Sequence, residues 1–208
     1  MNRVSAPSAI VLLVAVMMWP GNVASERDPF DELATELSRA ACIHIRFLHI
    51  VESQVFNDID SLPGSAVIDQ NGRYRIELPN DEFVCDGTFI HSYSRPNNQV
   101  VIEKAGPAGS SARHDLLFLA HLKDYYDITP IDVGSTYRLT MTESRQTTLP
   151  DSMVASVTGT PARLDYFDYY DINEDHNRLI IESLSTERPC HDSLFVPTWP
   201  DSVDRVKL

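Results

Sequence analysis

Apolar and polar residues alternate along most of this chain, and this period of two restricts the fold more than any other feature of the sequence. Ile43, Ile45 and Phe47 share one side of an extended segment, and Tyr74 and Ile76 do the same in a second one. The same alternation predicts further strands in segments 89–94, 99–104, 136–143, 153–159, 162–170, 177–184 and 194–198. Connections such as 69–72 and 171–177 are hairpin-sized, so the sheet is predicted to be mainly antiparallel.

Two segments have a helical period instead. Asp28 and Pro29 precede an apolar stripe, which predicts a helix that is capped at its N-terminus and lies against the sheet. A Gly-, Pro- and Ser-rich stretch then leads into the apolar segment 116–122, which lies between predicted strands. A helix inserted there is expected to cover one face of the sheet.

The predicted strands present more apolar surface than two modest helices can cover on a flat sheet. Curling the sheet solves this, because the apolar side then faces an interior. We therefore predict a mainly β protein of the α+β class: a curved, antiparallel, half-open barrel with an N-terminal helix and an inserted lid helix. Periodicity leaves open whether the interior is filled or hollow.

The first 25 residues have the composition of a secretory signal. Arg3 precedes an apolar run that ends at Pro20-Gly21, and small residues follow at a suitable distance for cleavage. We expect residues 1–25 to be removed and residues 26–208 to form a single exported domain. That domain has 16 basic and 30 acidic residues, a formal net charge of −14. Nucleic acid is therefore not expected as a partner, because the domain and the nucleic acid would both be negatively charged and would repel each other.

Residues that could support metal binding or catalysis do not form a convincing site. Segment 171–182 spaces its acidic residues like a calcium loop, but His176 stands where Gly is required, so a polar hairpin turn explains it better. The seven His residues show no zinc spacing. A hydrolase using Cys190 or Cys85 would lack an identifiable base. We expect no cofactor, no metal and no enzymatic activity.

Three Cys residues in an exported chain allow one disulfide with one thiol left over, or none. The sequence does not select among Cys42, Cys85 and Cys190.

The order of these pieces resembles the LolA-type outer-membrane lipoprotein carrier family over nearly the whole exported chain. The similar pieces are the capped helix and the segments "IHIRFLHIVESQ", "GSAVIDQNGRYRIEL" and "CDGTFIHSYSRPNNQVVIEK". The last is the most specific, through Asp86, Gly87, Tyr93, Gln99 and Val100. Two departures concern the lid: Gln70-Asn71 replaces a frequent Arg-Pro, so the Arg thought to latch the lid has no counterpart, and Ile76 replaces a frequent Trp.

The resemblance implies a monomeric periplasmic carrier. It would take acylated lipoproteins from an inner-membrane lipoprotein-releasing transporter and deliver them to an outer-membrane acceptor. Lipid-binding residues on the concave side would be Phe47, Tyr74, Ile76, Phe89, Tyr93, Leu139 and Met141, with Leu116, Leu119 and Ala120 on the lid. Two alternatives stay open: these side chains fill a solid core, or the half-barrel serves a regulatory module that senses lipid or lipoprotein.

Overall fold

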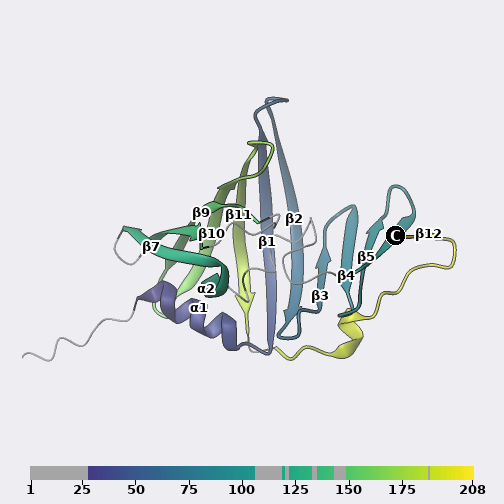
Figure 1. Cartoon of the computed structure of the whole chain (residues 1–208), viewed down its shortest axis with the longest axis horizontal. Coiled ribbons are helices and arrows are strands. Elements are labelled where there is room, and N and C mark those ends of the chain that lie inside the picture. The colour runs from purple at the N-terminus through teal and green to yellow at the C-terminus, as the bar shows by residue number, and fades with distance from the viewer. Residues whose placement is uncertain (1–27, 106–118, 120–121, 133–134, 143–148, 187) are drawn as a thin grey trace, which may run out of the picture.

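A computed structural model describes residues 28–105, 119, 122–132, 135–142, 149–186 and 188–208 of the chain. These residues form one 12-stranded sheet in the order β12-β6-β5-β4-β3-β2-β1-β11-β10-β9-β8-β7 (Figure 1). The strands are β1 (Cys42–Ser53), β2 (Asp58–Asp69), β3 (Tyr74–Glu77), β4 (Asp81–Cys85), β5 (Phe89–Ser94), β6 (Gln99–Lys104), β7 (Tyr126–Asp132), β8 (Thr136–Met141), β9 (Ser152–Thr158), β10 (Arg163–Tyr170), β11 (His176–Ser185) and β12 (Asp204–Lys207). The helices are α1 (Pro29–Arg39), α2 (Leu122–Tyr125) and the 3₁₀ helix η2 (Asp192–Phe195).

The sheet is antiparallel except where β12 runs parallel to β6. Its outermost strands, β12 and β7, do not pair with each other, so the sheet curves without closing. The predicted fold class, a half-open antiparallel barrel, is therefore confirmed. Figure 1 shows β1 and β2 at the centre, with their hairpin extending past all other strands.

Helix α1 forms as the sequence predicts. The Asp28 carboxylate accepts hydrogen bonds from the backbone N–H groups of Phe30 (2.9 Å) and Asp31 (3.3 Å), and Pro29 occupies the first turn. Its apolar stripe is buried against the sheet, and the Phe30 ring lies 4.9 Å from the ring centre of Tyr137 on β8. The helix thus covers the half of the sheet that contains β7 to β11.

The structure departs from the sequence prediction near the C-terminus. Segment 194–198 is predicted as a strand and that prediction is wrong, because Asp192–Phe195 forms η2 and an extended chain follows. Most of the predicted lid helix, including Leu116 and Ala120, lies outside the described residues. The described part of this region contains the short helix α2, which is followed directly by β7. The expected signal, residues 1–25, also lies outside the described residues. Among the described helices, none is both long and apolar enough to cross a membrane.

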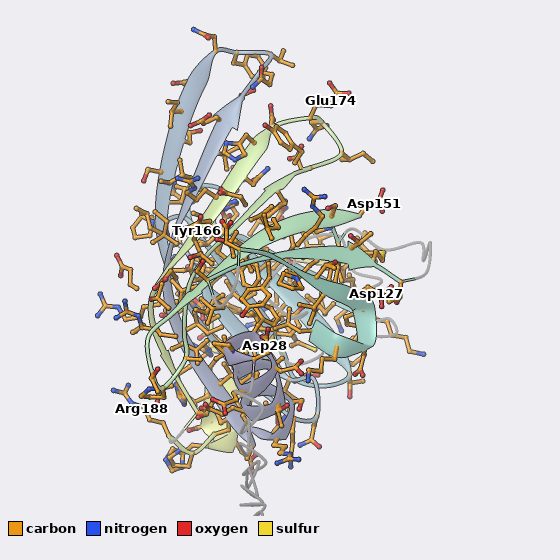
Figure 2. All side chains as sticks on the ribbon, turned by 90° about the vertical axis from the view of Figure 1, so that its left-hand side faces the viewer. Asp28, Asp127, Asp151, Tyr166, Glu174 and Arg188 are labelled. Atoms are coloured by element: carbon orange, nitrogen blue, oxygen red, sulfur yellow. A yellow bond between two sulfur atoms is a disulfide. The ribbon has the colours of Figure 1, made fainter. Side chains whose placement is uncertain are left out.

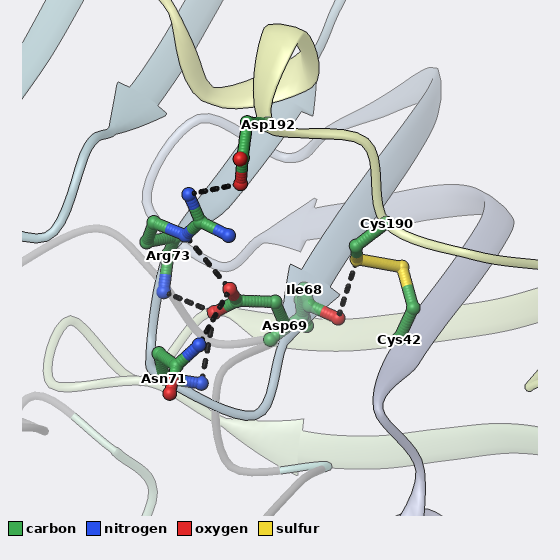
Figure 3. A network of polar contacts seen from close by, with 7 residues as sticks. All are labelled: Cys42, Ile68, Asp69, Asn71, Arg73, Cys190 and Asp192. Carbon is green, nitrogen blue, oxygen red and sulfur yellow. Dashed lines mark hydrogen bonds and ion pairs between the residues drawn. A yellow bond between two sulfur atoms is a disulfide. The ribbon is translucent and has the colours of Figure 1, made fainter.

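The last 21 residues, Arg188 to Leu208, form a segment that we call the C-terminal arm. It begins beside β1, where Cys190 forms a disulfide with Cys42 (Figure 3), and ends as β12. The sequence had left open which of the three cysteines, if any, form a disulfide. The third cysteine, Cys85, is a buried free thiol.

Charged groups hold the arm next to the disulfide. The buried Asp69 carboxylate accepts hydrogen bonds from the backbone N–H of Asn71 (2.9 Å) and from Arg73 Nε (2.8 Å), and Arg73 Nη1 donates to Asp192 of the arm at 2.9 Å (Figure 3). The Arg73 guanidinium also lies over the Phe195 ring, 4.6 Å from its centre. The turn between β2 and β3 is therefore joined to the arm by charge, hydrogen bonds and packing.

We expect loss of the disulfide to lower stability. Cys42→Ser and Cys190→Ser each free a loop of 148 residues, and removal of a native disulfide costs about 2–5 kcal/mol. Urea unfolding of both variants, and of the double variant Cys42→Ser/Cys190→Ser, which leaves no unpaired thiol at the broken bond, measures this. Equal midpoints for the original protein and both disulfide variants would show that the arm is held by its other contacts alone.

His91 makes stability depend on pH. Burial lowers its pKa below the usual value, although Asp86, with Oδ2 3.7 Å from Nε2, opposes this effect. The unfolded chain therefore binds the proton more readily, so the stability that His91 provides is complete above about pH 6.5 and is lost as the pH falls toward its folded pKa.

We accordingly expect His91→Leu to flatten the decline in unfolding free energy between about pH 7 and pH 5. Urea unfolding at a series of pH values measures this, and His191→Leu removes an exposed imidazole as the matched control. A decline that is as steep in His91→Leu as in the original protein contradicts the prediction.

Candidate functional site: the inner face of the sheet

One face of the sheet, which we call the inner face, is apolar across ten neighbouring strands. Cross-strand pairing places Ile76 beside Ala66 and Ala66 beside Ile45, which continues the apolar surface from β3 to β1. On the other side of β1 the same face continues through the pairs Leu179–Phe167, Phe167–Ala155, Ala155–Tyr137 and Leu139–Ile128. On β4 and β5 it includes Phe83, Cys85 and Ile90. Register alone therefore aligns these side chains into one apolar lining.

Six of the predicted lipid-binding residues lie in this lining or its core. Five are buried: Phe47, Tyr74, Ile76, Leu119 and Leu139. Met141 is partly buried and packs against the same core. The sequence thus placed these residues in one cluster from strands that are distant along the chain, whereas their contact with lipid stays a prediction.

Phe89 and Tyr93 lie on the opposite face, so their predicted place on the concave side is wrong. They alternate with Ile90, which faces inward opposite Cys85. Phe89 is 43% exposed, and the Tyr93 ring packs 4.7 Å from the ring centre of Trp199 in the arm. Strand β5 therefore carries apolar residues on both faces, and the arm covers its outer face.

The arm creates a second, smaller apolar layer on that outer face. Val84 and Val100 are completely buried outside the main core, and Phe195 and Val203 of the arm are buried as well. Arg75 Nε donates a 2.7 Å hydrogen bond to the carbonyl of Leu194, which holds the arm against β3. The outer face of this half is thus occupied by the chain's own residues.

A close contact lies at the centre of the inner face. Phe47 on β1 is directly opposite Gly64 on β2, and its ring occupies the space where a side chain at position 64 would begin. A Cβ atom there would also come within 2.9 Å of Leu78. Glycine is therefore required at position 64 for packing, since the Phe47 ring lies against the backbone.

A shallow groove opens beside this contact. It has a volume of about 430 Å³ and is lined by residues 63–65, residues 77–79 and Arg95. The groove forms because β2 continues beyond the end of β3, which pairs only with Ser65 to Ile68. Arg95 borders it and donates through Nη1 to the carbonyl of Leu78 at 2.8 Å. Apolar and polar groups therefore meet where the inner face reaches solvent.

A polar pair that the sequence did not reveal interrupts the lining between β1 and β11. His49 Nε2 and Asn177 Oδ1 are 2.9 Å apart, and Asn177 is buried with its Nδ2 donating to the carbonyl of Asp175. Both residues belong to the inner face through their pairing with Leu179 and Val51. A buried, satisfied pair of this kind fixes the register locally.

The residues considered for chemistry do not assemble a reactive site. Cys190 is in the disulfide, and burial raises the pKa of the Cys85 thiol, which disfavours the thiolate that a nucleophile needs. Within the described residues, no three His, Cys, Asp or Glu side chains are grouped so that they could hold a metal ion. The Asp171 carboxylate instead accepts hydrogen bonds from the backbone of Asn173 and Asp175 in the β10–β11 turn.

Comparisons with known proteins identify the fold. No family model and no curated protein matches the chain. Among solved structures, an uncharacterized conserved protein from Thermus thermophilus matches with a TM-score of 0.52 and 11% identity, covering 86% of this chain and 97% of that one. At this identity the likeness shows a shared fold and nothing about activity.

Two further solved structures match with lower TM-scores. A LolA superfamily protein from Nitrosomonas europaea matches with a TM-score of 0.46 and 9% identity, covering 80% of this chain and 97% of that one. A putative outer membrane lipoprotein-sorting protein domain from Vibrio parahaemolyticus matches with 0.45 and 7%, covering 80% and 94%.

We expect Gly64→Ala to destabilise the protein. The new methyl group would overlap the Phe47 ring, and overpacking of this kind costs about 1–3 kcal/mol. Urea unfolding measures the loss, with Ser65→Ala on the neighbouring residue as the control. An unchanged midpoint for Gly64→Ala would mean that Phe47 can move aside freely.

Proposed function

We propose that this protein is a carrier that binds the acyl chains of lipoproteins on its inner face and moves them between the two membranes of an envelope. The observation that supports this most is the inner face itself, which is apolar across ten strands of a sheet that does not close. Closed or two-layered sheets bury such a face with their own strands, whereas this sheet leaves it to helices and loops.

The described helices cover only one part of that face. Helix α1 packs mainly on β9 and α2, and α2 packs on β7. The apolar lining nevertheless continues through β2, β3 and β4 on the other side of β1. An apolar surface of this extent suits a ligand that is itself long and apolar.

Acyl chains have the required chemistry. Each buried CH₂ group contributes about 0.8 kcal/mol, so a chain of ordinary length leaves a membrane only when another apolar surface receives it. The acidic composition fits this role, because the formal net charge of −14 of residues 26–208 favours solubility and repels anionic lipid between transfers. The partners we propose are an inner-membrane lipoprotein-releasing transporter and an outer-membrane acceptor.

Leu78 and Val67 allow a matched test. Leu78 is half-buried, borders the groove and packs against the core beside Phe47. Val67 is also half-buried but lies on the outer face, between His44 and Arg75 in the strand pairing. A carboxylate introduced at position 78 would lie in the proposed path of the acyl chain, whereas one at position 67 would not.

We expect the purified protein to bind a synthetic triacylated lipopeptide and to keep it soluble. Leu78→Asp should weaken binding at least about tenfold, because a charge opposing an apolar chain must be desolvated or displaced. Val67→Asp should leave binding unchanged. Fluorescence titration with a labelled lipopeptide gives the affinities, and thermal unfolding confirms that both variants are folded. The proposal is wrong if the original protein neither binds the lipopeptide nor prevents its aggregation.

A further inference from the structure

The hairpin between β1 and β2 presents apolar side chains to solvent at its end. Val55 is 75% exposed, Phe56 82% and Ile59 64%, and we call these three residues the apolar tip. All residues from Gln54 to Pro63 are exposed. Figure 1 shows the end of the hairpin beyond the ends of the other strands. The apolar tip therefore contributes nothing to the core, and a large exposed apolar cluster of this kind marks a contact site.

The apolar tip is held in a defined conformation. The β1–β2 ladder is continuous from Cys42 and Asp69 to its last pair, Ser53 and Asp58. Asn57 adopts a left-handed backbone with φ of 51°, and its N–H donates to the carbonyl of Ser53 at 3.0 Å, which closes the turn. An ordered tip loses little conformational entropy on binding.

The neighbouring hairpin supports this position. The backbone N–H of Gln54 donates to the Asp175 carboxylate in the β10–β11 turn at 3.1 Å. Glu52 Oε2 lies 3.4 Å from His176 Nδ1 on β11. Val55 and Phe56 follow directly after this supported segment, so the sheet carries them outward as part of a rigid element.

Charge around the apolar tip indicates what kind of partner it fits. Between residues 51 and 64 the charged residues are Glu52, Asp58 and Asp60, all acidic and all exposed. These three carboxylates would be repelled by an anionic lipid surface and attracted by lysine and arginine side chains. The complementary surface is thus an apolar pocket with a basic rim.

We propose that the β1–β2 hairpin is a docking element for another protein, inserting Phe56 and Val55 into an apolar pocket that is bordered by Lys and Arg. Phe56 supplies the aromatic anchor in the centre, while Asp58 and Asp60 orient the approach at the rim. This surface is separate from the inner face, so the inference holds whether or not the protein carries acyl chains.

The test begins with the full-length protein in the cells that produce it. A photo-reactive p-benzoylphenylalanine replaces Phe56, and in a second variant it replaces Ile131, which is 47% exposed on β7 and serves as the matched apolar control. We expect irradiation at position 56 to give an adduct with one protein other than this chain. Mass spectrometry of the adduct should locate the linked residue in an apolar surface with Lys or Arg neighbours, and position 131 should not give this adduct.

Affinities between the two purified proteins then decide the roles of individual residues. Phe56→Ser should weaken binding at least about tenfold, and Ile131→Ser should not change it. The pair Asp58→Asn and Asp60→Asn should weaken binding mainly at low ionic strength and mainly through the association rate. Thermal unfolding should be the same for all variants, because the substituted side chains are exposed.

Three other results overturn the proposal. An adduct formed only with a second copy of the chain, together with concentration-dependent dimers, identifies a self-association surface. Binding to vesicles of phosphatidylcholine, with or without phosphatidylglycerol, that is lost in Phe56→Ser identifies a membrane-insertion tip. Absence of a position-56 adduct, or unchanged affinity in Phe56→Ser, removes the docking role.

Discussion

The register of β1 is the constraint on which the rest of the structure depends. This 12-residue strand pairs with β2 on one side and β11 on the other, and so joins the two halves of the sheet. A slip of one residue would turn Ile43, Ile45 and Phe47 to the outside and expose polar neighbours to the core. The Phe47–Gly64 contact and the His49–Asn177 pair favour a single register, since each fits only one alignment of the neighbouring strands.

The two halves of the sheet are covered from different sides. On the β7–β11 half, α1 covers the inner face and Tyr137 contacts its first turn. On the β3–β6 half, the C-terminal arm covers the outer face and is held there by the Cys42–Cys190 disulfide and by Arg73. Figure 2 shows the sheet at right angles to the view in Figure 1. The arm thus stabilises this half from its outer face, while Ile76, Phe83 and Ile90 on its inner face are buried as well.

Local periodicity predicted β1, β3, β5, β6 and β8 to β11 because a half-buried strand must alternate, and it predicted α1 because a cap and an apolar stripe are local features. It failed where both faces of a strand are apolar: Phe89 and Tyr93 alternate correctly, but only the arm, about 100 residues later in the chain, decides which side they face. The pairing of Cys42 with Cys190, which the sequence left open, and the strand β12 also depend on contacts between distant parts of the chain, and β4 and β7 were not predicted. The apolar tip was missed because Val55 and Phe56 prolong an apolar strand in sequence and leave the core only in space.

One sheet buries the apolar residues of its inner face and exposes those of the apolar tip. Apolar residues on the inner face are buried by curvature and by α1, whereas Phe56 is held away from the core by a long, fully paired hairpin. Beyond the last pair with β11, Glu52 and His176, the hairpin adds one pair, Ser53 and Asp58, and the turn that carries Val55 and Phe56. Polar residues in that turn would expose fewer apolar groups and reduce aggregation. The docking role that we propose for the hairpin accounts for the apolar residues at its end.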